Sequence, residues 1–197
     1  MPLVRRPSPP SEASSAPASL TEGSSDQRWA AVRAAAERPD GVALLAAALP
    51  QESDPRIRGA IFTALARIAT AESAEAVIPC LRSDDASLRT AAIDALRAMP
   101  AATGPYVAGL LADADADVRL LSCEFARHLP EGEANRLLGD LLLRETEKNV
   151  AAAAVEVLAE IGRPEVLPAL AACAERFADD GFLEFGIKVA VARIGRP

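Results

Sequence analysis

A short motif that opens on an acidic residue recurs along this chain at nearly constant intervals. The first copy, from Asp54, reads Asp-Pro-Arg-Ile-Arg-Gly-Ala, and the second, from Asp85, reads Asp-Ala-Ser-Leu-Arg-Thr-Ala. Later copies open at Asp115, Glu147 and Asp180, so successive intervals are 31, 30, 32 and 33 residues. A fixed period of this length is typical of solenoids, in which each unit packs only on its neighbours. Such arrays present long binding surfaces, so the period favours a binding function over catalysis.

Each period predicts two helices, because apolar residues recur at spacings of three and four and a turn signal falls inside every unit. The helices that follow the acidic residue are expected at 54–68, 85–98, 115–128, 147–160 and 180–194. The second helices are expected at 40–49, 72–82, 102–112, 131–143 and 164–176. An opening helix through Trp29 and Val32, capped by Ser25 or Asp26, brings the total to eleven. The prediction is an all-α solenoid of about five and a half repeats.

The first 25 residues have a different composition, dominated by Pro, Ser and Ala. They contain too little apolar mass to offset the entropy of ordering, so residues 1–25 are predicted to be a disordered tail and residues 26–197 the repeat domain. The segment Arg5-Arg6-Pro7-Ser8-Pro9-Pro10 is interpreted as a linker, with a short recognition or phosphorylation segment as the alternative.

Charge and cysteine content narrow the possible partners and compartment. The formal net charge is −7, from 28 acidic and 21 basic residues, and no basic stripe is evident, which argues against nucleic acid. Cys80, Cys123 and Cys173 are too far apart for a metal or redox motif and are read as buried apolar residues in a reducing compartment. No long apolar run or secretory signal is found, so we expect a cytoplasmic protein with no membrane contact. Abundant arginine and alanine suggest a bacterial source.

The repeat unit, Asp-Pro-x-Val-Arg followed by Ala-Ala and Ala-Leu, resembles the HEAT repeat family. Its length of about 30 residues is most similar to the short HEAT-like repeats named after phycobilisome lyases. The resemblance covers about residues 26–197 and implies a right-handed α-solenoid. It also implies that the helix after the acidic residue lies on the outer, convex side and that the second helices line the concave side. The motifs of ankyrin and tetratricopeptide repeats are absent.

Within the repeat, the acidic and arginine positions predict a structural ladder. Each aspartate can cap its helix, and the arginine four residues later can pair with an acidic residue of the adjacent unit. The ladder residues are Asp54, Arg58, Asp85, Arg89, Asp115 and Arg119, with Asp180 as a further cap. Ala151 and Glu184 stand where the pattern has arginine. We therefore expect the C-terminal units to curve differently there or to carry a partner contact.

No pattern in the sequence predicts catalysis. Asp113, Asp115, Asp117 and Glu124 match the ligand spacing of a calcium loop, but Val118 stands where that loop needs glycine. His128 is the single histidine and is interpreted as a helix-terminal residue. Repeat enzymes that bind iron use His-Glu pairs, which this chain lacks, and repeat DNA glycosylases use a basic, aromatic concave surface. We therefore expect a non-enzymatic protein with no catalytic residues, no metal site and no cofactor.

The remaining candidate is the concave surface of the second helices. The register that buries Val77 and Leu81 there exposes a set of small and mixed-charge residues with one aromatic anchor. These residues are Glu75, Pro79, Arg82, Tyr106, Gly109, Arg136, Asp140 and Arg144. Such a groove favours a scaffold or adaptor that binds a partner protein or peptide. The alternative is an accessory subunit, of bilin-lyase or chaperone-like type, that presents a cofactor to a target protein.

The last helix predicts a further contact. Val189, Val191 and Ile194 have no following unit to cover them. We expect either a homo-dimer through this end or an unusually polar outer face.

Overall fold

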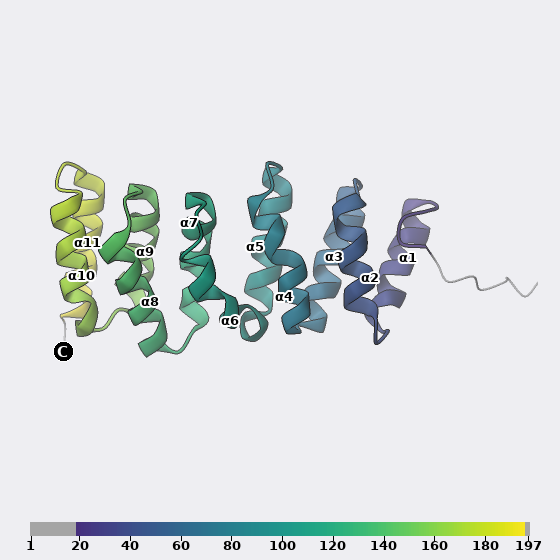
Figure 1. Cartoon of the computed structure of the whole chain (residues 1–197), viewed down its shortest axis with the longest axis horizontal. Coiled ribbons are helices and arrows are strands. Elements are labelled where there is room, and N and C mark those ends of the chain that lie inside the picture. Colours follow the sequence, from purple (N-terminus) through teal and green to yellow (C-terminus); the bar gives the residue numbers. More distant parts are fainter. Residues whose placement is uncertain (1–18, 196–197) are drawn as a thin grey trace, which may run out of the picture.

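The computed structural model describes residues 19–195, and over this range it is an array of eleven α-helices without a strand (Figure 1). The helices that follow the acidic residues, with α1, form what we call the first row. Its members are α1 (Ser25–Ala36), α3 (Pro55–Ile68), α5 (Ala86–Ala98), α7 (Ala116–Phe125), α9 (Lys148–Ile161) and α11 (Gly181–Ile194). The second row consists of α2 (Gly41–Ala48), α4 (Ala71–Val77), α6 (Pro100–Leu110), α8 (Glu131–Arg144) and α10 (Leu167–Arg176). The predicted fold class and helix number are confirmed.

The N-terminal cap differs from the prediction. The cap of α1 is Ser24, whose hydroxyl accepts the backbone N–H of Gln27 while the Gln27 side chain accepts the N–H of Ser24. This reciprocal pair satisfies two N–H groups that the first turn leaves without a helical partner. Ser25, one of the two predicted caps, instead donates its hydroxyl to Asp54 at 2.6 Å. Of the predicted tail at residues 1–25, residues 1–18 lie outside the described residues, and Ser25 begins α1.

Prolines shorten the second-row helices. Pro50 and Pro79 lie in 3-10 turns that follow α2 and α4, and Pro164 begins a 3-10 turn that precedes α10. Proline has no backbone N–H and its ring crowds the preceding turn, so it disfavours the interior of a regular α-helix, although α6 continues through Pro105. The predicted helices 40–49, 72–82 and 164–176 are therefore each part α-helix and part 3-10 turn.

One apolar core runs along the whole array between the two rows. Leu45, Leu65, Leu96, Leu138 and Leu158, from five different helices, are all fully buried in it. Short helices are marginal alone, so this shared core supplies most of their stability.

The cysteines fit the predicted apolar role, with one correction. Cys123 and Cys173 are buried, and burial raises the pKa of the Cys123 thiol to about 12, which leaves it protonated and unreactive. Cys80 is only half-buried, because it lies in the 3-10 turn after α4 and not on the buried face of a regular helix.

Contact between neighbouring repeats is uneven. Adjacent first-row helices contact each other more extensively than the second-row helices beside them, for example α1 with α3 compared with α2 with α4. The second-row helices are also mostly shorter, so this difference does not decide which row lies on the convex side, and the predicted placement stays a prediction. The least extensive first-row contact is between α5 and α7, and the most extensive is between α9 and α11. Neither contact measures curvature, so the change predicted at Ala151 and Glu184 stays a prediction.

At Ala151 and Glu184, where the repeat pattern has arginine, nearby lysines form the ion pairs. Ala151 is fully buried, and its small side chain permits close packing of α9. Lys148 of the same helix reaches forward to the carboxylate of Asp180, at 3.4 Å. Glu184 pairs with Lys188 one turn along α11, at 2.6 Å.

The three apolar residues of α11 that were predicted to lack cover differ in exposure. Ile194 is buried against the turn at Gly162, because α11 rotates it toward α9. Val189 is half-buried and Val191 is 40% exposed. The same helix carries the Glu184–Lys188 pair and exposes Phe182 and Phe185, so its outer face is mixed and the homo-dimer stays a prediction.

Candidate functional site

The aspartates that open the repeats cap their helices in the structure. Asp85 accepts the backbone N–H groups of Ser87 and Leu88, at 2.8 and 3.3 Å. Asp54, Asp115 and Asp180 accept from Arg56, Asp117 and Leu183 in the same way. The N–H groups of Leu88 and Ser87, with Arg58, hold the pKa of Asp85 below its ordinary value. The caps fix where each first-row helix begins.

The arginines of the ladder reach toward the next repeat, but not to equivalent partners. Arg58 donates to Asp85 at 3.0 Å, as predicted. Arg119 binds the carboxylate of Glu145 through two nitrogens, at 2.8 and 2.9 Å. Arg89 differs, because it donates to the carbonyl of Ser83 at 2.5 Å and forms no ion pair with any described residue. At the junction between α5 and α7, where the first-row contact is least extensive, the ladder pair is absent and Arg97 pairs with Glu124 instead, at 3.4 Å.

Sequence reasoning missed a second set of repeat positions, two residues before each cap. The side chains of Glu52, Ser83, Asp113 and Glu145 accept the backbone N–H of Asp54, Asp85, Asp115 and Glu147, at 2.8–3.1 Å. It also missed Arg28, which pairs with Glu52 at 2.9 Å and forms the first rung of the ladder. The available signal was spacing, since Arg28 precedes Arg58 by 30 residues.

Glu145 is the most enclosed carboxylate of the ladder, with 3% of the residue exposed. Burial acts to raise its pKa, but the Arg119 guanidinium and the N–H groups of Glu147 and Thr146 outweigh burial and hold the pKa below the ordinary value. Every oxygen of this side chain has a partner. The charged form is therefore part of the folded structure.

The lowered pKa of Glu145 predicts a dependence of stability on pH. Because its folded pKa is depressed, the contribution is present above the unfolded value, near 4.5, and is lost as pH falls through the folded pKa. We expect the urea midpoint of the wild type to fall more steeply between pH 5 and pH 3 than that of Glu145→Gln. Since the pKa values of Asp54, Asp85 and Asp180 are also below their ordinary value, these groups add to the pH dependence of both proteins, and the difference between the two is the quantity to measure. Parallel curves would contradict this assignment.

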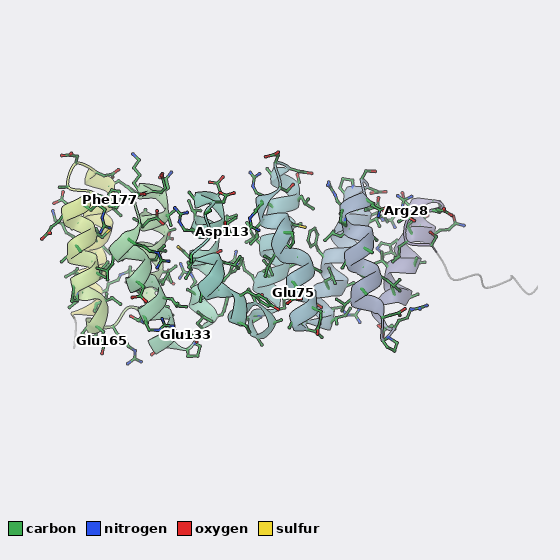
Figure 2. The ribbon with its side chains drawn as sticks, viewed as in Figure 1. Arg28, Glu75, Asp113, Glu133, Glu165 and Phe177 are labelled. Carbon is green, nitrogen blue, oxygen red and sulfur yellow. The ribbon has the colours of Figure 1, made fainter. Side chains whose placement is uncertain are left out.

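Several residues predicted for the binding surface instead join adjacent repeats. The Tyr106 hydroxyl donates to Glu75 at 2.8 Å, and that carboxylate raises the pKa of Tyr106 (Figure 2 labels Glu75). Arg82 forms an ion pair with Asp113, and Arg144 donates to the carbonyl of Leu111 at 3.0 Å. Glu75, Arg82, Tyr106 and Arg144 therefore have local roles between second-row helices. Pro79 and Gly109 are exposed.

The structure brings Arg136 and Asp140 together in an open groove of about 710 Å³ between α8 and α10. The two side chains pair one helical turn apart, at 3.6 Å. The floor is apolar and formed of small residues, Gly139, Val166 and Ala169, all buried. The rim adds Arg163, Glu165 and Leu143, and Leu143 is 52% exposed. An apolar floor with a rim of both charge signs is a chemistry suited to a peptide.

Asn135 fixes the shape of this groove. Its amide nitrogen donates to the carbonyls of Glu131 and Ile161, at 2.7 and 3.0 Å, and its amide oxygen accepts the N–H of Arg163 at 2.7 Å. The side chain is 4% exposed, so these bonds are shielded from water. Asn135 thereby holds α8 to the turn that precedes α10.

The structure also shows the positions of the residues that the sequence analysis excluded as catalytic or metal-binding. His128 is exposed in the 3-10 turn after α7, and Asp113 and Asp115 serve as the capping residues described above. Within residues 19–195, no three His, Cys, Asp or Glu side chains are grouped to hold a metal ion. None of the helices described is long and apolar enough to cross a bilayer.

Comparison with known proteins agrees with this repeat architecture. A family model for HEAT repeats matches residues 17–97 and 105–181. The chain belongs to the HEAT repeat family. No curated protein matches it significantly.

Among solved structures, this HEAT-repeat chain is similar to one described as the structural basis of microtubule plus end tracking by XMAP215, CLIP-170 and EB1. The TM-score is 0.59 at 15% identity, over 91% of this chain and 90% of that one. Cex1p gives a TM-score of 0.56 at 12% identity, over 85% of this chain and 38% of its own. These two support the fold alone. The complex of CpcE and CpcF of phycocyanin lyase from Nostoc covers 98% of this chain at 16% identity, with a TM-score of 0.39, too low to bear on activity.

Proposed function

We propose that this HEAT-repeat chain is a non-enzymatic scaffold that binds a peptide segment of a partner protein in the groove between α8 and α10. The observation that carries the proposal is the groove itself. It is open, is floored by Gly139, Val166 and Ala169, and is edged by Arg136 and Asp140. HEAT repeats typically act as protein-interaction scaffolds, and their extended surfaces suit this role.

The details of the groove indicate what such a segment contains. Gly139 has no side chain, and a Cβ there would lie 3.8 Å from Val166 and 3.9 Å from Ala169, so α8 packs close to these residues and the floor is shallow. Leu143 adds exposed apolar surface at one end. Arg136 and Asp140 are both about half exposed, so each can exchange its present partner for a charge on the peptide.

The test is affinity capture from native lysate with the full chain as bait, beside Arg136→Glu, Leu143→Asp and a matched control, Arg33→Glu on α1. We expect one protein to be captured by the wild type and the control and to be reduced at least tenfold by each groove substitution, a loss of about 1.4 kcal/mol. Capture that all the variants retain would contradict the groove assignment. A chromophore in the eluate without a captured protein would favour the accessory-subunit alternative.

A further inference from the structure

The largest exposed apolar side chains lie on the other face of the array, on α11. Phe182 is 80% exposed and Phe185 is 66% exposed, in a chain with only 4% aromatic residues. They are three positions apart and so project from the same side of the helix. Neither packs into the core. Exposed aromatic pairs of this kind are characteristic of binding surfaces and are costly to leave in water.

Phe182 and Phe185 border a groove of about 510 Å³ on the first row, between α9 and α11. Its walls are mainly small or apolar, with Ala152 and Ala153 from α9 and Gly186 from α11. A Cβ at Gly186 would lie 3.6 Å from Val155, an ordinary van der Waals distance, so α11 packs close to α9 at this glycine. The groove therefore offers two aromatic side chains beside a shallow trough that accepts side chains from a ligand.

The groove is lined by two carboxylates and one guanidinium, those of Glu156, Glu160 and Arg193. Glu156 is exposed on its α9 wall and forms no hydrogen bond or ion pair with another described residue. Glu160 is paired with Arg127, and Arg193 donates to the carbonyl of Ala159 at 3.5 Å. Glu156 also lines the adjoining hollow between α7 and α9. An uncompensated carboxylate beside an apolar trough is complementary to a ligand that carries a positive charge next to apolar side chains.

We propose that the groove formed by α9 and α11 is a second docking site, for a partner's amphipathic helix with an apolar stripe and a flanking lysine or arginine. The apolar stripe covers Phe182 and Phe185, and the basic residue pairs with Glu156. Helix-in-groove recognition of this type buries side chains at spacings of three, four and seven. Because the site lies on the first row and the groove of the proposed function lies on the second, the chain can bridge two partners.

The test uses four labelled helical peptides of about 16 residues, long enough to hold a helix. The four peptides combine a stripe of leucine or serine with a flanking lysine or glutamate. Their binding to the full chain is followed by fluorescence anisotropy. We expect the leucine–lysine peptide to bind most tightly, at least tenfold more tightly than the serine–lysine peptide. The double variant Phe182→Ser with Phe185→Ser should lose this preference, and Glu156→Lys should reverse the order of the lysine and glutamate peptides.

Arg33→Glu, on α1 and outside both grooves, is the matched control and should leave peptide binding unchanged. A loss of peptide binding in Arg136→Glu and not in the phenylalanine variant would place the peptide in the groove of the proposed function and contradict this site. Since both phenylalanines are exposed, their replacement is compatible with folding, and circular dichroism checks it. The proposal is overturned if no peptide binds or if the variants bind like the wild type. It is also overturned if sedimentation shows that a second copy, or the N-terminal tail of one, occupies the groove in the wild type and leaves it in the phenylalanine variant.

Discussion

Replacing Glu145 with alanine is expected to lower the free energy of unfolding by about 3–5 kcal/mol, the usual effect of removing one partner of a buried pair. The Arg119 side chain is 15% exposed and would keep its charge without the carboxylate that now binds two of its nitrogens. The N–H groups of Thr146 and Glu147 would lose their acceptor as well. Urea unfolding followed by circular dichroism measures the change.

A matched control is Glu37→Ala, which removes the same side chain from another pair between repeats. Glu37 and Arg67 are 3.2 Å apart, but both side chains are mostly exposed, so the pair is worth less than about 1 kcal/mol. Replacing both Arg119 and Glu145 with methionine should recover much of the loss, since no buried charge is then left unpaired. If Glu145→Ala and Glu37→Ala lowered the free energy of unfolding equally, the burial of the Arg119–Glu145 pair would make no contribution to stability.

The fold was predictable from the sequence because its signals are local and repeated. The acidic caps, the spacing of apolar residues and the turn signals each act within one unit, and five copies reinforce one another. The predicted helices at 54–68 and 85–98 accordingly agree with α3 and α5 within a residue or so. Glu145 was not found because its role depends on a partner 26 residues away and not on its neighbours in sequence.

The candidate site was less predictable, because it depends on how second-row helices face one another. Tyr106 was predicted as a free anchor, but a helix one repeat away places Glu75 within hydrogen-bond distance of its hydroxyl. The 3-10 turns at Pro50 and Pro79 shift the second-row register, which a regular helical pattern cannot represent. Phe182 and Phe185 were visible as an aromatic pair, but their exposure depends on the rotation of α11 against α9.

Replacing Leu158 with alanine is expected to cost about 2–5 kcal/mol, because the side chain is fully buried in α9 and its removal leaves a cavity. In a solenoid, the free energy of unfolding is approximately the sum of the stabilities of the single repeats and of the contacts between neighbouring repeats. A destabilised repeat therefore destabilises its neighbours only where the contact between them is strong. First-row contact is least extensive between α5 and α7. Hydrogen exchange at low denaturant should therefore accelerate in α7 to α11 while α1 to α5 keep their protection.

The mirror substitution is Leu65→Ala in α3, which removes an equally buried leucine on the other side of that junction. It should accelerate exchange in α1 to α5 and spare α9 and α11, because the same weak contact limits its spread. If either substitution accelerated exchange evenly over all eleven helices, the array would be unfolding as one unit. The missing ion pair at Arg89 would then have no energetic consequence, and a boundary between two cooperative halves would be ruled out.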